Sequence, residues 1–230
     1  MDLSNLEKKI GFNFKDKELL KTAFIHRSYL NEHPKEKLDH NERLEFLGDS
    51  VLGFIISDYL YKKFPKNPEG DLTNFRSSIV NARILSQVAG ELELGKYLFL
   101  SRGEEATGGR ERQYLLANTY ESLLGALYLD SGISEATNFI KKTLLPHLEE
   151  IIENKLYKDY KSNLQEAAQA KFNITPTYKI LSEKGPDHTK TFETGAYLDK
   201  KLLSTGAGRS KQSSEQEAAK IALDKLAKLK

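Results

Sequence analysis

Apolar residues in the first 152 positions recur at helical spacing, and no alternating strand pattern appears among them. The repeat is clearest in two groups, Leu19, Leu20, Ala23 and Phe24, and then Phe75, Ile79 and Val80. Glycines punctuate the pattern at positions 70, 108–109 and 132, where we expect loops. The front of the chain is therefore predicted to be all-α.

From Tyr160 onward the pattern changes to short alternating segments between two helices. The predicted elements are a helix over 164–172, strands over 177–181, 191–198 and 201–205, and a last helix capped by Ser210. Gly206 and Gly208 are expected to close the third strand. The order α-β-β-β-α predicts a small α+β unit with two helices on one face of a sheet.

These patterns predict two domains, residues 1–152 and 160–230, joined by a polar, lysine-rich linker over 153–159. The formal net charge of +2 hides an asymmetry between them. From Tyr160 onward there are 13 Lys/Arg against 8 Asp/Glu, whereas the first 159 residues have 22 against 25. The rear is thus the candidate for binding a polyanion.

Composition excludes several classes of protein. There is no run of 18 apolar residues, so no membrane span is expected, and the first residues lack the pattern of a signal peptide. The chain contains no cysteine, which excludes disulfides, a thiolate nucleophile and a cysteine-ligated zinc. We therefore expect a cytoplasmic protein with no membrane partner.

The stretch NERLEFLGDSVLG, residues 41–53, carries an acidic stripe on a helix. Glu42, Glu45 and Asp49 fall within roughly 60° of one another at helical spacing. Leu44, Leu47, Val51 and Phe54 are expected on the opposite, apolar side. A solvated face is the simpler interpretation of such a stripe. However, glycine costs about 1 kcal/mol in a helix interior, so Gly48 and Gly53 indicate that another element approaches closely.

A second polar stripe lies in LLANTYESLLGALYLDSG, residues 115–132, where Asn118, Glu121 and Gly125 share one helix face. Bringing the two stripes together would cluster carboxylates that repel one another without a cation. A hard divalent ion with oxygen ligands would resolve that conflict. The alternative is a pair of buried helices that hydrogen-bond through Asn118 and Glu121, and the residues alone leave both interpretations open.

Several motifs together resemble the ribonuclease III family over essentially the whole chain. NERLEFLGDSVLG resembles its signature motif, LANTYESLLGALYLD its second acidic motif, and PEGDLTNFRSSIVN the segment between them. The rear, with LQE, GPDH and GAGRSKQSSEQEAA, resembles a double-stranded-RNA-binding domain. The resemblance implies an endoribonuclease that cleaves both strands of duplex RNA, leaves short 3′ overhangs, and serves rRNA and mRNA processing and decay.

The resemblance also implies roles for individual residues and a homodimer formed through the front domain. The implied ligands of a catalytic Mg²⁺, for which Mn²⁺ can substitute, are Glu45, Asp49, Asn118 and Glu121, with Asp49 and Glu121 as catalytic residues. Glu42 and Glu69 would support this acidic cluster. The implied RNA contacts are Ser162, Gln165 and Glu166 on the first rear helix, Pro186, Asp187 and His188 in a loop, and Arg209, Ser210 and Lys211 at the last helix.

Three positions depart from the family pattern. Asn118 stands where the family usually carries aspartate, and an amide oxygen brings no negative charge to a metal. This departure is open to three explanations: natural variation, a cleavage-deficient protein that only binds duplex RNA, or engineering. Because the other acids are all retained, we favour an active enzyme. Gln212 and Ser214 stand where lysine and alanine are usual, and His26 is expected to be a hydrogen-bonded structural histidine.

Overall fold

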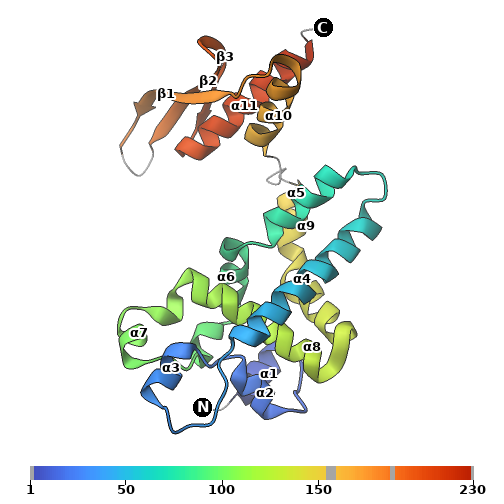
Figure 1. The fold of residues 1–230 in the computed structure, drawn as a ribbon, viewed down its shortest axis with the longest axis vertical. Coiled ribbons are helices and arrows are strands. Elements are labelled where there is room, and N and C mark those ends of the chain that lie inside the picture. The colour runs from blue at the N-terminus through green and yellow to red at the C-terminus, as the bar shows by residue number, and fades with distance from the viewer. Residues whose placement is uncertain (1–2, 154–158, 187–189, 229–230) are drawn as a thin grey trace. The chain divides into compact units, whose positions relative to one another are not determined.

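The computed structural model describes residues 3–153, 159–186 and 190–228, which fall into two compact units over residues 1–157 and 158–230 (Figure 1). Of the predicted linker, Glu153 ends one helix and Asp159 precedes the next, while residues 154–158 lie outside the described residues. Asp187 and His188, two of the expected RNA contacts, also lie outside them.

The first unit is helical, as predicted. Its helices are α1 Ser4–Ile10, α2 Lys17–Thr22, α3 Arg27–Glu32, α4 Glu42–Lys63, α5 Glu69–Ile79, α6 Ala82–Glu91, α7 Arg102–Ala106, α8 Gln113–Thr143 and α9 Leu145–Glu153, with 3-10 turns η1 Leu94–Tyr97 and η2 Gly109–Glu111. At Gly132 the structure has a kink within α8, at a positive φ of 80°, in place of the expected loop. The loop expected at Gly70 is wrong, because Gly70 lies in the first turn of α5.

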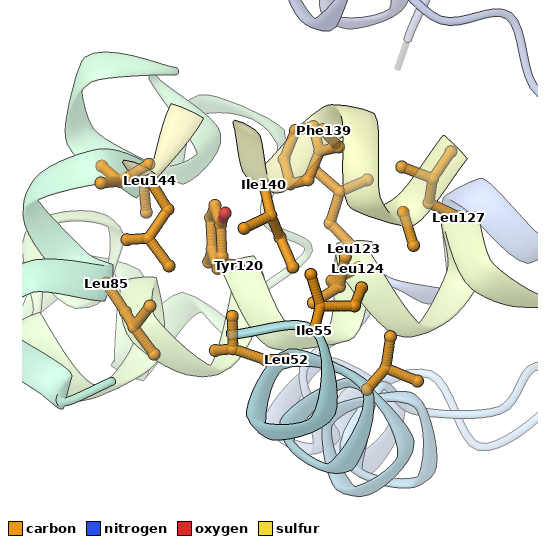
Figure 2. Packing of buried hydrophobic residues seen from close by; sticks show 14 of the residues in the cluster. Leu52, Ile55, Leu85, Tyr120, Leu123, Leu124, Leu127, Phe139, Ile140 and Leu144 are labelled. Carbon is orange, nitrogen blue, oxygen red and sulfur yellow. The ribbon is translucent and has the colours of Figure 1, made fainter. Parts of the chain in front are cut away.

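The core of this unit is built around α8, which packs against α4 on one side and α6 on another. Figure 2 shows Ile55 of α4 pointing toward Leu124 of α8, and Leu52 of α4 on the side of Tyr120. The fully buried ring of Tyr120 stacks at 5.3 Å on Phe139 from the second half of the same helix. Burying this much apolar surface is what holds α4 and α8 together.

Two glycines allow α4 and α8 to touch through their backbones. A Cβ atom on Gly48 would lie 1.8 Å from the carbonyl oxygen of Glu121, and one on Gly125 would lie 2.3 Å from that of Leu44. Any side chain at either position would force the helices apart. The close approach predicted at Gly48 is therefore confirmed. The one predicted at Gly53 is wrong, because no atom of the described residues lies within 4 Å of a Cβ there.

The apolar face expected on α4 is only partly correct. Leu44 and Val51 are buried, but Phe54 is 62% exposed. Phe54 lies about 120° around the helix from Gly48, so it points away from α8 once the glycine contact has fixed the orientation of α4. Phe46 at 78% and Tyr61 at 73% are exposed on the same side as Phe54.

The second unit contains α10 Tyr160–Phe172, β1 Thr177–Lys184, β2 Thr191–Leu198, β3 Lys201–Gly208 and α11 Lys211–Lys228. The strands form an antiparallel sheet in the order β1-β2-β3, and α11 packs against β2, β3 and α10 (Figure 1). The predicted α-β-β-β-α order is confirmed. The strand predicted over 201–205 is longer than expected: Gly206 lies inside β3, whereas Gly208 is its last residue, as expected.

Helix α11 crosses directly over these two glycines. A Cβ on Gly206 would lie 2.1 Å from the backbone nitrogen of Ala218, and one on Gly208 would lie 2.2 Å from Oγ of Ser213. Gly206 therefore marks close packing of the strand against the helix, and Gly208 combines such packing with the end of the strand.

Candidate metal and RNA-binding sites

The glycine contact between α4 and α8 brings the two acidic stripes together in the first unit. Glu45 and Asp49 project from α4, and Asn118 and Glu121 project from the facing part of α8. Glu45, Asn118 and Glu121 are half-buried, whereas Asp49 is exposed. The side-chain amide of Asn118 donates a hydrogen bond to the Glu45 carboxylate across the two helices. The structure thus joins the four residues expected to form the metal site.

The carboxylates of this group disfavour one another's ionisation. Burial, followed by the charges of Asp49 and Glu45, raises the pKa of Glu121 from its usual 4.5 to about 7. Burial and the neighbouring charges of Glu42 and Asp49 also raise the pKa of Glu45, against the opposing effect of the Asn118 hydrogen bond. A carboxyl group that remains partly protonated at neutral pH is a common sign of a functional site.

The donor set fits a hard divalent cation, although the side chains do not converge on one point. Within residues 3–153, 159–186 and 190–228, no three His, Cys, Asp or Glu side chains form a group that is ready to hold a metal ion. Three carboxylates and one amide oxygen are nevertheless the ligand types that Mg²⁺ prefers. A cation would also relieve the repulsion that raises the pKa of Glu121.

The two supporting acids lie in different places. Glu42 is exposed one turn before Glu45, near Arg27 at 3.8 Å and His40 at 3.7 Å. Glu69 begins α5 and lines a groove with Tyr61, which is about 18 Å along α4 from Asp49. Within one protomer the structure therefore brings Glu42 beside the acidic cluster and leaves Glu69 apart from it.

His26 is hydrogen-bonded, as expected. Its Nδ1 lies 2.8 Å from Oγ of Ser28 and accepts a hydrogen bond from the backbone N–H of the same residue at the start of α3. Burial lowers its pKa, and the charge of Glu104 partly opposes that effect. A capping role for the neutral ring explains this histidine without any part in chemistry.

In the second unit, a hydrogen bond and an ion pair hold the N-terminal ends of α10 and α11 side by side. The carboxylate of Asp159 caps α10 by accepting from Ser162, and it also accepts from the Gln216 amide at 3.0 Å. The ammonium of Lys161 lies 2.6 Å from the Glu215 carboxylate. The sequence did not predict these two interactions, because residues more than 50 positions apart leave no periodic pattern.

The expected RNA contacts project from these helix ends and from the loop between β1 and β2. Gln165 and Glu166 are exposed on α10 near its capped end, and Pro186 is exposed in the loop. Lys211 begins α11 directly after Ser210, whose hydroxyl accepts from the backbone N–H of Ser213. Arg209 precedes them and is also exposed.

Ser214 has a structural partner that explains its hydroxyl. Its Oγ lies 2.7 Å from Oγ1 of Thr194, and both side chains are fully buried between α11 and β2. The pair fixes the first turn of α11 on the sheet through one buried hydrogen bond.

Comparison with known protein families identifies both units. A family described as "Ribonuclease-III-like" matches residues 16–148, and one described as "Double-stranded RNA binding motif" matches residues 160–226. The class that the fold and the acidic cluster define is a helical nuclease joined to an RNA-binding module.

Similar proteins carry the assignment further. The chain is 45% identical to "Ribonuclease 3" of a Nitratiruptor species over 96% of this chain and 95% of the relative. It is 47% identical to "Ribonuclease 3" of Carboxydothermus hydrogenoformans over 98% and 96% of the two chains. The chain belongs to the ribonuclease III family and is an endoribonuclease that acts on double-stranded RNA.

Solved structures agree for the first unit. The nuclease domain of the Campylobacter jejuni enzyme superposes with a TM-score of 0.58 at 37% identity, covering 62% of this chain and 95% of that chain. The description of that structure concerns flexibility in a region involved in dimer formation. Across the described helices of the present chain, none is both long and apolar enough to span a membrane.

Proposed function

We propose that the cluster of Glu45, Asp49, Asn118 and Glu121 holds a divalent cation, Mg²⁺ or in its place Mn²⁺, for hydrolysis of RNA phosphodiester bonds. The observation that carries this proposal is the backbone contact of α4 and α8 at Gly48 and Gly125, which places these four side chains on facing helices. The raised pKa of Glu121, caused by burial and then by the charges of Asp49 and Glu45, supports it. Bound there, Mg²⁺ would supply charge neutralisation for the phosphate and Lewis-acid activation of a water.

The protein's own residues prepare this site in three ways. The glycine contact sets the spacing between α4 and α8, so the ligands start from rigid helices. Burial and the charges of Asp49 and Glu45 raise the pKa of Glu121 to about 7, so this carboxyl group would give up a proton as the cation binds. Asn118 orients Glu45 through its amide and offers its oxygen as a neutral ligand.

We also propose a homodimer formed through the endonuclease domain. Three exposed aromatic rings, those of Phe46, Phe54 and Tyr61, line one side of α4, and an apolar surface of this kind is unusual on a monomer. The related Campylobacter jejuni domain has a region involved in dimer formation. Within one protomer, Glu69 is distant from the cluster. We therefore propose its expected supporting role only for the dimer.

The second unit binds double-stranded RNA. We propose that its contacts are Ser162, Gln165 and Glu166 on α10, Pro186, Asp187 and His188 in the loop, and Arg209, Ser210 and Lys211 at α11. A-form duplexes hide their bases from side chains, so these groups would meet 2′-hydroxyls and phosphates. The N-terminal end of α11 adds its own preference for anions.

We further propose staggered cleavage of both strands with short 3′ overhangs, acting in rRNA and mRNA processing and decay in the cytoplasm. Incubating the full chain with a long RNA duplex, with and without Mg²⁺, and sizing the products tests the core of the proposal. We expect short duplex fragments only with the cation, and none from a single strand of the same sequence. Binding without cleavage at any Mg²⁺ or Mn²⁺ concentration would instead identify a protein that only binds RNA.

A further inference from the structure

A carboxylate lies among the cations of the proposed RNA surface. Glu183 of β1 is the cross-strand partner of Phe192 in β2. Its Oε1 lies 3.8 Å from the ammonium of Lys211, and its Oε2 lies 3.7 Å from that of Lys190. The ammonium of Lys211 also lies 5.9 Å from the centre of the Phe192 ring. One acid thus contacts two lysines that come from different parts of the unit.

We propose that Glu183 is an internal competitor for RNA phosphate, which lowers the affinity of the second unit for duplex RNA and flattens its dependence on salt. The proposal rests on the function proposed for Lys211. In the free protein the carboxylate occupies the positions around Lys211 and Lys190 that a phosphate oxygen would take.

The geometry makes this competition reversible. Both ion pairs are long and exposed, with 40% of the Glu183 side chain accessible, so each is weak enough for a phosphate to displace. The carboxylate remains attached to β1 after displacement, next to the Phe192 position over which Lys211 lies. Its negative charge then repels the phosphate that has replaced it.

Counterion release gives the expected sign for the salt dependence. Each lysine that neutralises a phosphate on binding steepens the fall of affinity with salt by about one unit of log–log slope. A lysine whose charge is already neutralised by Glu183 adds less than one unit to this slope. Removing the carboxylate should therefore tighten binding at low salt and steepen the slope by about one.

The test compares Glu183→Gln with a matched control in the full chain. Glu217→Gln removes the same charge from a side chain of similar exposure, 43%, which pairs with Lys220 farther along α11. Binding to a duplex is measured in EDTA, so that cleavage does not interfere, across a range of salt concentrations. We expect about three- to tenfold tighter binding for Glu183→Gln at low salt, and a smaller change for the control.

Two further variants separate the outcomes. In a chain that already carries Lys211→Gln and Lys190→Gln, Glu183→Gln should no longer tighten binding. If Glu183→Gln and Glu217→Gln change the affinity equally, the effect comes from the net charge of the protein alone, and the proposal is overturned. Weaker binding by Glu183→Gln would overturn it too, by showing that the carboxylate positions Lys211. If the unmodified chain binds no duplex at low salt, the proposed function itself fails.

Discussion

Gly48 and Glu121 lie in backbone contact, with the Glu121 carbonyl oxygen 1.8 Å from the place where a Cβ of residue 48 would be. Glu121 is also the acid whose pKa is raised to about 7 by burial and by its acidic neighbours. At this contact Glu121 of α8 therefore touches α4, the helix that carries Glu45 and Asp49. The contact sets the distance between α4 and α8.

Gly48→Ala should separate the two helices. Overpacking of this kind costs about 1–3 kcal/mol, and here the obstacle is backbone that cannot rotate away. Gly53→Ala is the control, because none of the atoms that the structure describes lies within 4 Å of its Cβ, and alanine should stabilise the helix by about 1 kcal/mol. Chemical unfolding at a fixed protein concentration measures both. A Gly48→Ala protein as stable as the original would contradict the contact.

The metal-free protein should show a pH-dependent cost of the acidic cluster. The folded state holds the Glu121 proton more tightly than the unfolded chain, because the pKa rises from 4.5 to about 7 on folding. The stabilising contribution is fully present below pH 4.5 and is lost as the pH rises through 7. Glu121→Gln should therefore raise the melting temperature in EDTA more at pH 8 than at pH 5. The loss of stability is nearly complete at pH 8, about one unit above the raised pKa, and is still small at pH 5. Equal gains at the two pH values would count against the electrostatic coupling.

Asn118→Asp should tighten the metal site of an enzyme that lacks one charge. We expect the Mg²⁺ concentration for half-maximal cleavage to fall about tenfold, whereas Glu121→Gln should lower the cleavage rate about a hundredfold. Without metal, Asn118→Asp loses the amide that donates to Glu45, so its melting temperature in EDTA should drop. Mg²⁺ titrations of the three proteins decide, and an unchanged Mg²⁺ requirement in Asn118→Asp would exclude residue 118 as a ligand.

The buried hydroxyl pair of the second unit can be tested by a double-mutant cycle. Ser214→Ala leaves the Thr194 hydroxyl buried without its partner, which should cost about 1–3 kcal/mol. Thr194→Val alone should cost less, because Ser214 retains a 2.8 Å hydrogen bond to the Lys211 carbonyl. The double variant should recover most of the loss of Ser214→Ala. Strictly additive losses would mean that the two hydroxyls do not interact.

The exposed side of α4 should mediate assembly. Phe46→Glu should convert the proposed dimer into a monomer, because a charge would have to be buried without a partner. Phe172→Glu alters an exposed phenylalanine in the second unit and should leave the dimer intact. Light scattering at micromolar concentration distinguishes the two. A monomeric unmodified chain would rule out the dimer proposal.

Helical spacing was sufficient to predict the two acidic stripes, because the relation between Glu45 and Asp49, or between Asn118 and Glu121, is local. The glycine at position 48 indicated a close approach but not the partner, so the residues alone left open whether the two stripes meet. Spacing could not predict that Phe54 is exposed, since that depends on where α8 crosses α4 rather than on the hydrophobicity of residue 54.

The same limit applies to the second unit. Gly206 lies inside β3 whereas Gly208 ends it, and their sequence context could not show this difference, because glycine marks both turns and close packing. The contact of Glu183 with Lys211 joins residues 28 positions apart, and neither residue type indicates it. Such pairs become visible only when β1 and α11 are placed in space.

The contacts of the Asp159 carboxylate also determine where a fragment that contains the second unit can begin. Although it precedes α10, it caps that helix and binds Gln216 of α11, so it belongs to the RNA-binding module by its contacts. A fragment that begins at Tyr160 would lose both interactions at once and expose the frayed first turn that carries Ser162. Transplanting this module onto another protein therefore requires the graft to start upstream of Asp159.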